Sequence, residues 1–167
     1  MSEFLLPKLL TDKAREVVDA NRKAGRRIAL AESCTGGLVA AAITEVPGSS
    51  EIFEAAFVTY SNASKVTQLR VSEDLVETFG AVSVATAWAM ARGALQATDA
   101  DVAVAITGIA GPGGGSASKP VGTVVFARAE RDADPAKIVA DEKRFDVAER
   151  SEVRLQAALC ALELLMP

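Results

Sequence analysis

Apolar and polar residues alternate along the chain with two different periods, and the changes of period mark the predicted helices and strands. Residues 9–23 repeat apolar positions at helical spacing, and Gly25 supplies the residue type that commonly ends a helix. The short apolar run at 27–30 predicts a buried strand. The apolar stretch at 38–43 predicts a helix that follows this strand closely.

The rest of the chain continues the alternation until two strands follow each other. Further strands are predicted at 53–60, 101–107, 122–128 and 137–145, and further helices from 61, at 72–79, 83–98 and 147–165. The glycines at 108–116 exclude regular structure there. This order predicts one three-layer α/β/α domain over residues 1–167, with a mixed, mostly parallel sheet that carries a hairpin.

Composition and charge narrow the class of protein. Half of the 167 residues are hydrophobic, so one domain can bury a large core. The formal net charge of −4, without a basic stripe, argues against nucleic acid as a partner. No apolar run approaches the roughly 18 residues of a membrane span, and residues 1–7 lack the regions of a signal peptide. We therefore expect a cytoplasmic protein without a membrane partner.

The chain contains no histidine, which constrains any catalytic chemistry. Ser-His-Asp and Cys-His arrangements are excluded, and so are the commonest general base and the commonest metal ligand. Two cysteines are too few for a disulfide framework. Cys160 lies in the predicted C-terminal helix and is expected in the core. An enzyme with this composition needs another base.

Residues 31–37 (AESCTGG) join the first predicted strand to the following helix. Such a junction presents a side chain at the carboxyl end of a sheet, where open α/β folds bind ligands, and it offers backbone N–H groups from the helix start. Ser33 is the candidate nucleophile. The alternatives are that Ser33 or Thr35 only caps the helix, or that Cys34 is the nucleophile.

Tyr60 and Lys65 are the candidate activating residues. Tyr60 ends a predicted strand and Lys65 lies one turn into the next helix, so both can reach the edge of the sheet where Ser33 lies. A serine hydroxyl needs a base, and burial can lower the pKa of a lysine enough for it to serve. The alternative is a solvated lysine beside a tyrosine that packs in the core.

Two further features predict a site for a phosphorylated ligand. The glycine-rich segment 108–115 follows a strand and can approach a phosphate or ribose closely, with Thr107 facing the same cleft; the alternative is a flexible surface loop. Arg150 and Arg154 lie one helical turn apart and suit a phosphate, although pairing with neighbouring glutamates on the surface is the commoner arrangement.

Four ordered motifs give the chain its resemblance to a known family: residues 31–37, 57–65 (FVTYSNASK), 80–83 (GAVS) and 108–115 (GIAGPGGG). From about Leu9 to Leu165 the chain resembles the C-terminal domain of the competence/damage-inducible CinA family, which includes nicotinamide-nucleotide amidases. The resemblance implies hydrolysis of the carboxamide of nicotinamide mononucleotide to nicotinate mononucleotide and ammonia, in pyridine-nucleotide salvage.

The resemblance implies roles for individual residues of this chain. Ser33 matches the proposed nucleophile, Lys65 and Tyr60 the activating pair, and residues 144–154 the C-terminal arginine motif. That motif often reads Gly-Asp-Arg where this chain has residues 148–150 (AER), and the N-terminal pyrophosphatase-type domain of larger members is absent. The residues expected to bind substrate or oxyanion are Thr35, Gly36, Gly37, Asn62, Thr107, Gly108, Gly111 and Arg150.

The expected mechanism uses neither a metal nor a cofactor. Neutral Lys65, aided by Tyr60, takes the proton of Ser33, and N–H groups of residues 35–37 stabilise the oxyanion. Two alternatives remain: a non-catalytic nucleotide-binding or regulatory module, and an acyl-transfer enzyme that uses Cys34. An exposed apolar helix face makes a homodimer the expected assembly.

Overall fold

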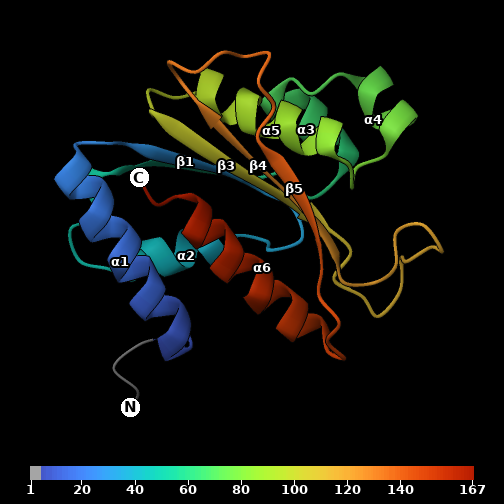
Figure 1. Cartoon of the computed structure of the whole chain (residues 1–167), viewed down its shortest axis with the longest axis horizontal. Helices are drawn as coiled ribbons and strands as arrows, with labels where there is room; N and C mark the ends of the chain where they lie inside the picture. Colours follow the sequence, from blue (N-terminus) through green and yellow to red (C-terminus); the bar gives the residue numbers. More distant parts are fainter. Residues whose placement is uncertain (1–4) are drawn as a thin grey trace.

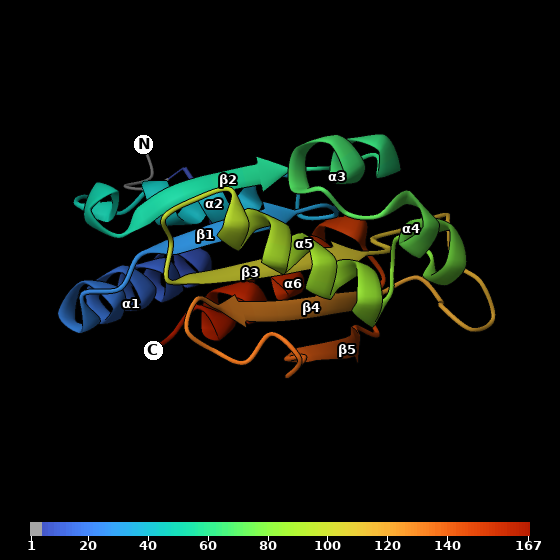
Figure 2. The same cartoon turned by 90° about the horizontal axis from the view of Figure 1, so that it is seen from above.

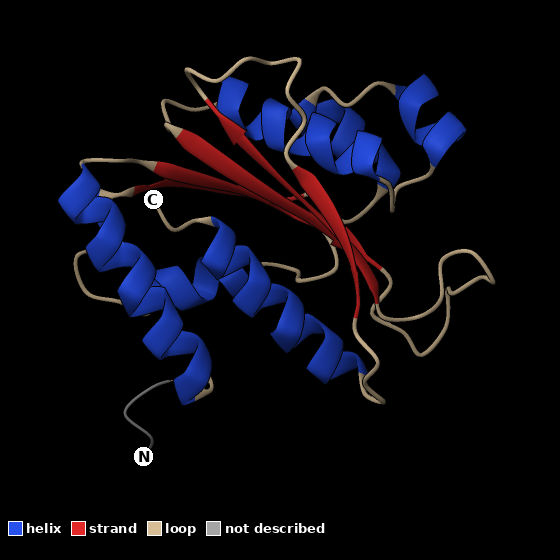
Figure 3. Cartoon of the chain, viewed as in Figure 1, coloured by secondary structure: helices blue, strands red, loops and turns tan. Residues whose placement is uncertain are grey.

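The computed structural model describes residues 5–167 as a five-stranded sheet between two layers of helices (Figures 1 and 3). The strands occur across the sheet in the order β2-β1-β3-β4-β5. Their bounds are β1 Ile28–Glu32, β2 Phe53–Val58, β3 Val102–Gly108, β4 Thr123–Glu130 and β5 Ala140–Arg144. The expected three-layer α/β/α architecture is confirmed.

Four strands point in one direction and β4 alone runs against them (Figure 2). β1 pairs in parallel with β2 and β3, whereas β4 pairs antiparallel with β3 and β5. This arrangement confirms the mixed, mostly parallel sheet with a hairpin. Glu32, the last residue of β1, is level with Val58 of β2 and Ile106 of β3. The segments that follow these three strands therefore leave the sheet at the same edge.

Three helices cover each face of the sheet (Figure 1). One layer contains α1 Lys8–Ala24, α2 Leu38–Thr44 and α6 Arg150–Leu164; the other contains α3 Asn62–Leu69, α4 Glu73–Phe79 and α5 Val84–Gln96. All six helices were expected, but the 3₁₀ turn at Ser49–Glu51 was not. The predicted strand 53–60 ends two residues early, because the next two carbonyls, those of Thr59 and Tyr60, accept hydrogen bonds from Lys65.

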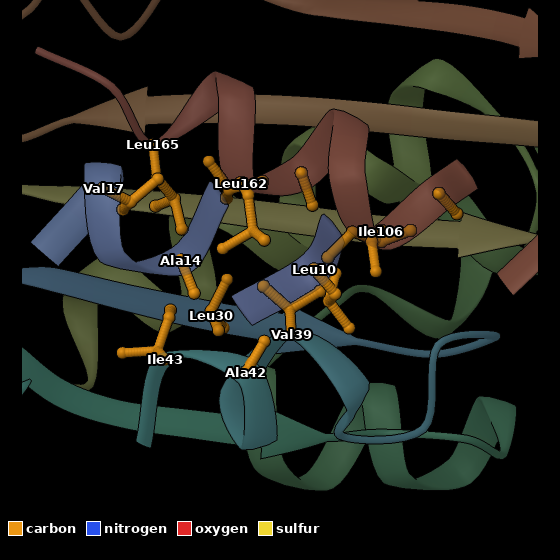
Figure 4. Packing of buried hydrophobic residues seen from close by; sticks show 14 of the residues in the cluster. Leu10, Ala14, Val17, Leu30, Val39, Ala42, Ile43, Ile106, Leu162 and Leu165 are labelled. Carbon is orange, nitrogen blue, oxygen red and sulfur yellow. The ribbon is translucent and has the colours of Figure 1, made fainter. Parts of the chain in front are cut away.

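The two faces of the sheet bury side chains of different size. Toward α1, α2 and α6, the central strands present large residues, such as Leu30 and Ile106, which pack around Val39 and Leu162 (Figure 4). Toward α5 they present mainly alanines, at positions 29, 31, 103, 105, 127 and 129. Strand side chains alternate between faces, so the apolar runs encode both layers.

The alanine face lets the helices of that layer approach closely. Gly93 in α5 meets the end of α3, and a Cβ placed there would lie 2.1 Å from the Leu69 carbonyl oxygen. Leu69 is buried beneath α5. This close contact holds α3, and with it Lys65, against the sheet.

One residue of the outer layers is less buried than expected. Cys160, expected in the core, is only half-buried, and its Sγ lies 3.8 Å from Lys143 Nζ near the surface of α6.

Among residues 5–167, no helix has both the length and the apolar character that crossing a bilayer requires. The expectation about a signal peptide concerns residues 1–7, of which the first four lie outside the described part of the chain.

Candidate active site

The three parallel strands β2, β1 and β3 end beside a cavity of about 270 Å³. Its wall combines residues that follow each strand with the glycine-rich loop and the start of α6. The lining residues are Ser33, Cys34, Tyr60, Lys65, Ala81, Val82, Thr107, Gly108, Ile109, Ala110, Gly111, Gly113, Gly114 and Arg150. The sheet thus brings together, at one edge, motifs that are widely separated in sequence.

Ser33 and Lys65 form the polar centre of this cavity. Lys65 Nζ lies 3.1 Å from Ser33 Oγ, and both residues are buried, with exposed fractions of 1% for Lys65 and 7% for Ser33. Ser61 begins α3 by accepting a hydrogen bond from the Ser64 N–H, which starts the helix immediately beyond the edge of the sheet. Lys65, one turn later, is thereby directed back toward Ser33. The structure confirms that these two residues meet.

Burial shifts Lys65 toward the neutral amine. Burial lowers the pKa of Lys65 from its ordinary value of 10.5. Its Nζ lies 2.8 Å from the carbonyl oxygen of Thr59 and 3.2 Å from that of Tyr60, and both can only accept hydrogen bonds. A neutral amine donates its two hydrogens to these carbonyls, which leaves its lone pair for the Ser33 hydroxyl. This is the geometry of a general base.

Cys34 lies in the same cavity, where the same physical effect disfavours its thiolate. Burial raises the pKa of the Cys34 thiol to about 11, because the thiolate loses solvation; the nearby charge of Glu32 raises it further. At neutral pH the thiol is therefore protonated, and a thiol is a poor nucleophile. Burial favours the neutral form of both residues, which activates Lys65 and disfavours Cys34 as a nucleophile.

The turn after Ser33 uses two of its expected oxyanion donors internally. The Gly36 N–H donates to the Ser33 carbonyl at 3.0 Å, and the Gly37 N–H donates to Glu32 Oε2 at 3.0 Å. Both glycines have positive φ, 58° and 95°, which a side chain would oppose. Within residues 5–167, the Thr35 N–H and Oγ1 bond to no other group, although Thr35 is fully buried. Thr35 is thus the expected donor that this geometry leaves free.

Glu32 supports the turn at residues 33–37 and was not among the predicted site residues. Its carboxylate is fully buried and accepts hydrogen bonds from the N–H groups of Gly37, Val39 and Ala40 at the start of α2. A carboxylate there stabilises the positive end of the helix. The available signal was an acidic residue that directly follows a buried apolar strand and precedes a helix.

Tyr60 lines the cavity as expected, but its hydroxyl is bonded to Arg150 and not to Lys65. Its phenol is exposed and its hydroxyl accepts a hydrogen bond from Arg150 Nη2 at 3.0 Å; only its main-chain carbonyl contacts Lys65. Arg150 also donates from Nη1 to the Gly111 carbonyl at 2.6 Å. The side chains of Tyr60 and Arg150 thus border the cavity on the side of the glycine-rich loop.

The other arginine of the expected phosphate pair points elsewhere. Arg154 is half-buried and donates to the carbonyls of Cys34, from Nε at 3.2 Å, and Thr35, from Nη2 at 3.0 Å. It therefore binds the carbonyls of the turn after Ser33 and does not line the cavity. Of the two arginines, only Arg150 is placed to meet a ligand.

The remaining expected residues divide between the cavity and the outer surface. Thr107 donates from its hydroxyl to the Ala81 carbonyl at 2.9 Å, which ties the end of β3 to the segment before α5. A Cβ at Gly108 would lie 2.8 Å from Val124 Cγ2, so glycine is required for close packing there. Gly111 lines the cavity, but Asn62 lines a separate hollow between α3 and α4.

Metal ligands do not gather at this edge of the sheet. Across residues 5–167, no three side chains of His, Cys, Asp or Glu type come together to form a metal site. The polar groups that line the cavity are hydroxyls, one thiol, one amine, one guanidinium and main-chain amides. These groups suit proton transfer and binding of an anionic ligand.

Comparison with known proteins identifies the relatives of this chain. It is 48% identical over 156 residues to the nicotinamide-nucleotide amidohydrolase PncC of Enterobacter agglomerans, covering 93% of each chain. It is 46% identical over 157 residues to PncC of Pseudomonas putida, covering 94% of this chain and 95% of that protein. The crystal structure of the competence/damage-inducible protein CihA from Agrobacterium tumefaciens superposes with a TM-score of 0.91 at 45% identity, covering 99% and 97% of the two chains.

The same assignment follows from the domain family. The family model of the CinA C-terminal domain matches residues 10–167, which includes every residue of the cavity described above. The expected resemblance is therefore confirmed over nearly the whole chain. By motif, fold and overall similarity, this chain belongs to the CinA C-terminal domain family.

Proposed function

We propose that this chain hydrolyses the carboxamide of nicotinamide mononucleotide, giving nicotinate mononucleotide and ammonia, by a Ser33–Lys65 mechanism. The observation that carries the proposal is the buried contact of 3.1 Å between Lys65 Nζ and Ser33 Oγ. The substrate is inferred from PncC relatives at 46–48% identity over nearly the whole chain. The reaction contributes to pyridine-nucleotide salvage, because its product retains the nucleotide.

The first step forms an acyl-enzyme. Ser33 Oγ attacks the carboxamide carbon while its proton passes to the lone pair of Lys65 Nζ. The negative charge that develops on the carboxamide oxygen is stabilised by the free Thr35 N–H; loss of one such donor costs about 10²–10³ in kcat in other enzymes. The C–N bond then breaks, and Lys65 returns the proton to the departing nitrogen, which leaves as ammonia.

The second step releases the acid. Water attacks the ester carbon and gives a proton to Lys65 Nζ, and the bond to Ser33 Oγ breaks as the serine regains that proton. The two carbonyls that accept from Lys65 hold the amine in one position through both steps. The same lysine thus acts as base and acid in turn, which supplies the role that histidine has in other serine hydrolases.

The phosphate end of the substrate is assigned to Arg150 and the glycine-rich loop. Arg150 is exposed, borders the cavity and contacts both Tyr60 and Gly111, so its guanidinium can turn toward a bound phosphate. Arg154 is excluded from this role because the carbonyls of the nucleophile turn already occupy it. The ribose lies between the two ends, along residues 108–111.

Ammonia release from nicotinamide mononucleotide tests this proposal. Purified protein should release one ammonia for each nicotinate mononucleotide formed, and Ser33→Ala should abolish turnover while it still binds the substrate. A protein that binds the nucleotide but releases no ammonia would instead be a binding module. Activity that survives in Ser33→Ala and disappears in Cys34→Ala would transfer the nucleophile role to the cysteine.

A further inference from the structure

The peptide groups of residues 33–37 are divided between two charged side chains. Arg154, from α6, donates to the carbonyls of Cys34 and Thr35. Glu32, from the end of β1, accepts from the Gly37 N–H and from two N–H groups of α2. One side of the turn is thus held through its carbonyls and the other through its N–H groups.

The contact with Arg154 also determines where two N–H groups point. In a trans peptide the carbonyl of one residue and the N–H of the next point in opposite directions. When the Cys34 carbonyl faces Arg154, the Thr35 N–H faces away from it. The Thr35 carbonyl faces Arg154 as well, so the next N–H, that of Gly36, points away and meets the Ser33 carbonyl at 3.0 Å.

Thr35 carries an independent sign of a missing ligand. A buried main-chain N–H without a partner is rare in folded proteins, because it costs the free energy of an unmade hydrogen bond. In the described part of the chain, neither the Thr35 N–H nor its Oγ1 has a partner, although its exposed fraction is 0%. These donors lie two residues after the Ser33 nucleophile. Thr35 itself does not line the cavity, but it directly follows Cys34, which does.

We propose that Arg154 is a positioning residue for the deamidation, which orients the Cys34–Thr35 peptide so that the Thr35 N–H meets the oxyanion. This inference rests on the proposed function. Arg154 does not line the cavity and so acts only through the peptide that it holds. Without Arg154, the Cys34 carbonyl loses its donor, whereas the Thr35 carbonyl keeps the Leu38 N–H at 3.1 Å. The Cys34–Thr35 peptide can then rotate so that the carbonyl, and not the N–H, faces the reacting oxygen.

The test compares Arg154→Ala with a matched control. Arg131 also donates to three main-chain carbonyls, those of Leu95, Thr98 and Ala100, but it lies outside the cavity. Arg154→Ala should lower kcat about 100-fold, the size of effect expected when a reacting geometry is misplaced, with KM within about twofold of the wild type. Arg131→Ala should leave both constants unchanged, while its melting temperature shows the cost of losing such contacts.

Two further measurements distinguish positioning from general destabilisation. Millimolar guanidinium should restore part of kcat in Arg154→Ala, because it can refill the vacated site, and should not stimulate wild type. Arg154→Lys keeps the charge but not the two-pronged geometry, so it should fall between wild type and Arg154→Ala. The lysine variant also preserves the test if the alanine variant does not fold.

A fluorophosphonate probe separates this inference from the proposed substrate. Ser33 Oγ forms a bond to phosphorus, its proton passes to Lys65, and fluoride leaves; the phosphoryl oxygen then occupies the oxyanion position. Labelling of Ser33 should slow in Arg154→Ala as much as kcat does, whichever amide is the substrate. Labelling without hydrolysis of nicotinamide mononucleotide would refute the proposed substrate alone. The positioning role would be overturned if Arg154→Ala had the labelling rate and the kcat of the wild type. It would also be overturned if this variant had a raised KM at constant kcat.

Discussion

The two walls of the cavity differ in how firmly they are held. Residues 33–35 are buried, and the turn around them is bonded to Arg154 and Glu32 on opposite sides. Residues 112–118 of the glycine-rich loop are all exposed and have few hydrogen bonds, among them one from the Ser116 N–H to the Lys119 carbonyl. The wall around Ser33 is therefore buried and bonded, whereas the tip of the loop, of which Gly113 and Gly114 line the cavity, is open to solvent.

This difference matches the two tasks of the site. Proton transfer and oxyanion stabilisation require donors that are fixed before the reaction, since reorganisation would cost part of their benefit. The non-reacting end of a substrate needs contact and charge but tolerates adjustment. The comparison therefore predicts that changes in the nucleophile turn affect kcat and that changes beside the loop affect KM.

The largest effect is expected from Lys65→Met, which removes the base but keeps an unbranched chain of similar length. We expect kcat to fall by about 10⁴-fold or more, as in serine hydrolases that lose a member of the catalytic group. Steady-state ammonia release measures this effect, with circular dichroism as the check on folding. Turnover within tenfold of wild type would remove Lys65 from the mechanism.

The pH dependence of activity and of stability also tests the role of Lys65 as the base. Lys65 is a base only when neutral, so kcat/KM should rise with pH and level off at a pKa below 10.5, the direction in which burial shifts this residue. The unfolded chain binds a proton more tightly than the folded one, so the free energy of unfolding rises with pH between the lowered pKa and 10.5. Lys65→Met should lack both trends in titrations of activity and of stability.

Next in size is Arg150→Ala, on the side of the loop. Loss of a charge-assisted hydrogen bond of about 1.5–3 kcal/mol should raise KM for nicotinamide mononucleotide by roughly ten- to a hundredfold. The kcat value should change little, because Arg150 contacts neither Ser33 nor Lys65. Tyr60→Phe is the matched variant and should have a smaller effect on KM. A collapse of kcat with constant KM in Arg150→Ala would contradict the division between the walls.

A pair of glycine variants tests rigidity directly. Gly37 has φ of 95° in the nucleophile turn, where Gly37→Ala should cost about 1 kcal/mol or more in the free energy of unfolding. Gly113 in the loop has open space around a would-be Cβ, so Gly113→Ala should be nearly neutral. Denaturant unfolding of both variants measures the difference. Equal costs would show that the loop is as constrained as the turn.

The smallest effect is expected from Cys34→Ala. The thiol has a pKa of about 11 and stays protonated at neutral pH, so its removal should change kcat by no more than about threefold. Iodoacetamide should likewise label wild-type Cys34 slowly. Inactivation by Cys34→Ser as well as by Cys34→Ala would restore the cysteine as a nucleophile.

The homodimer stays a prediction, which light scattering of the purified chain would test.

Much of the fold could be predicted because apolar periodicity records burial directly. The runs at 27–30 and 101–107 become central strands, and the alanine-rich segment 83–98 becomes the helix that packs on their small-residue face. Strand bounds were predicted less well: β2 ends two residues earlier than predicted, β4 ends two residues later, and β5 begins at residue 140 instead of 137. These ends depend on pairing with the neighbouring strand, which the local sequence does not contain.

Some residues of the site could be predicted from the sequence and others could not. Residue types made Ser33 and Lys65 candidates, because a serine at a strand–helix junction in a chain without histidine needs another base. The resemblance to the CinA family then favoured them over a helix cap and a solvated lysine. The sequence could not assign Tyr60 or Arg154, because a side chain of either type reaches several partners and only the packing of α6 selects one. Glu32 is the clearest case, since burial converts an ordinary surface residue type into the cap of α2.

The sequence by itself therefore determined the order of strands and helices, the candidate nucleophile and its base, because these depend on residue type and spacing along the chain. Only the tertiary structure decided which N–H groups remain free, which arginine faces the cavity and which ionisable residue is activated by burial. The physical reason is that hydrogen-bond partners and desolvation depend on neighbours in space. In this protein, Arg154 bonds to carbonyls 119 and 120 positions away, and Lys65 meets Ser33 across 32 positions.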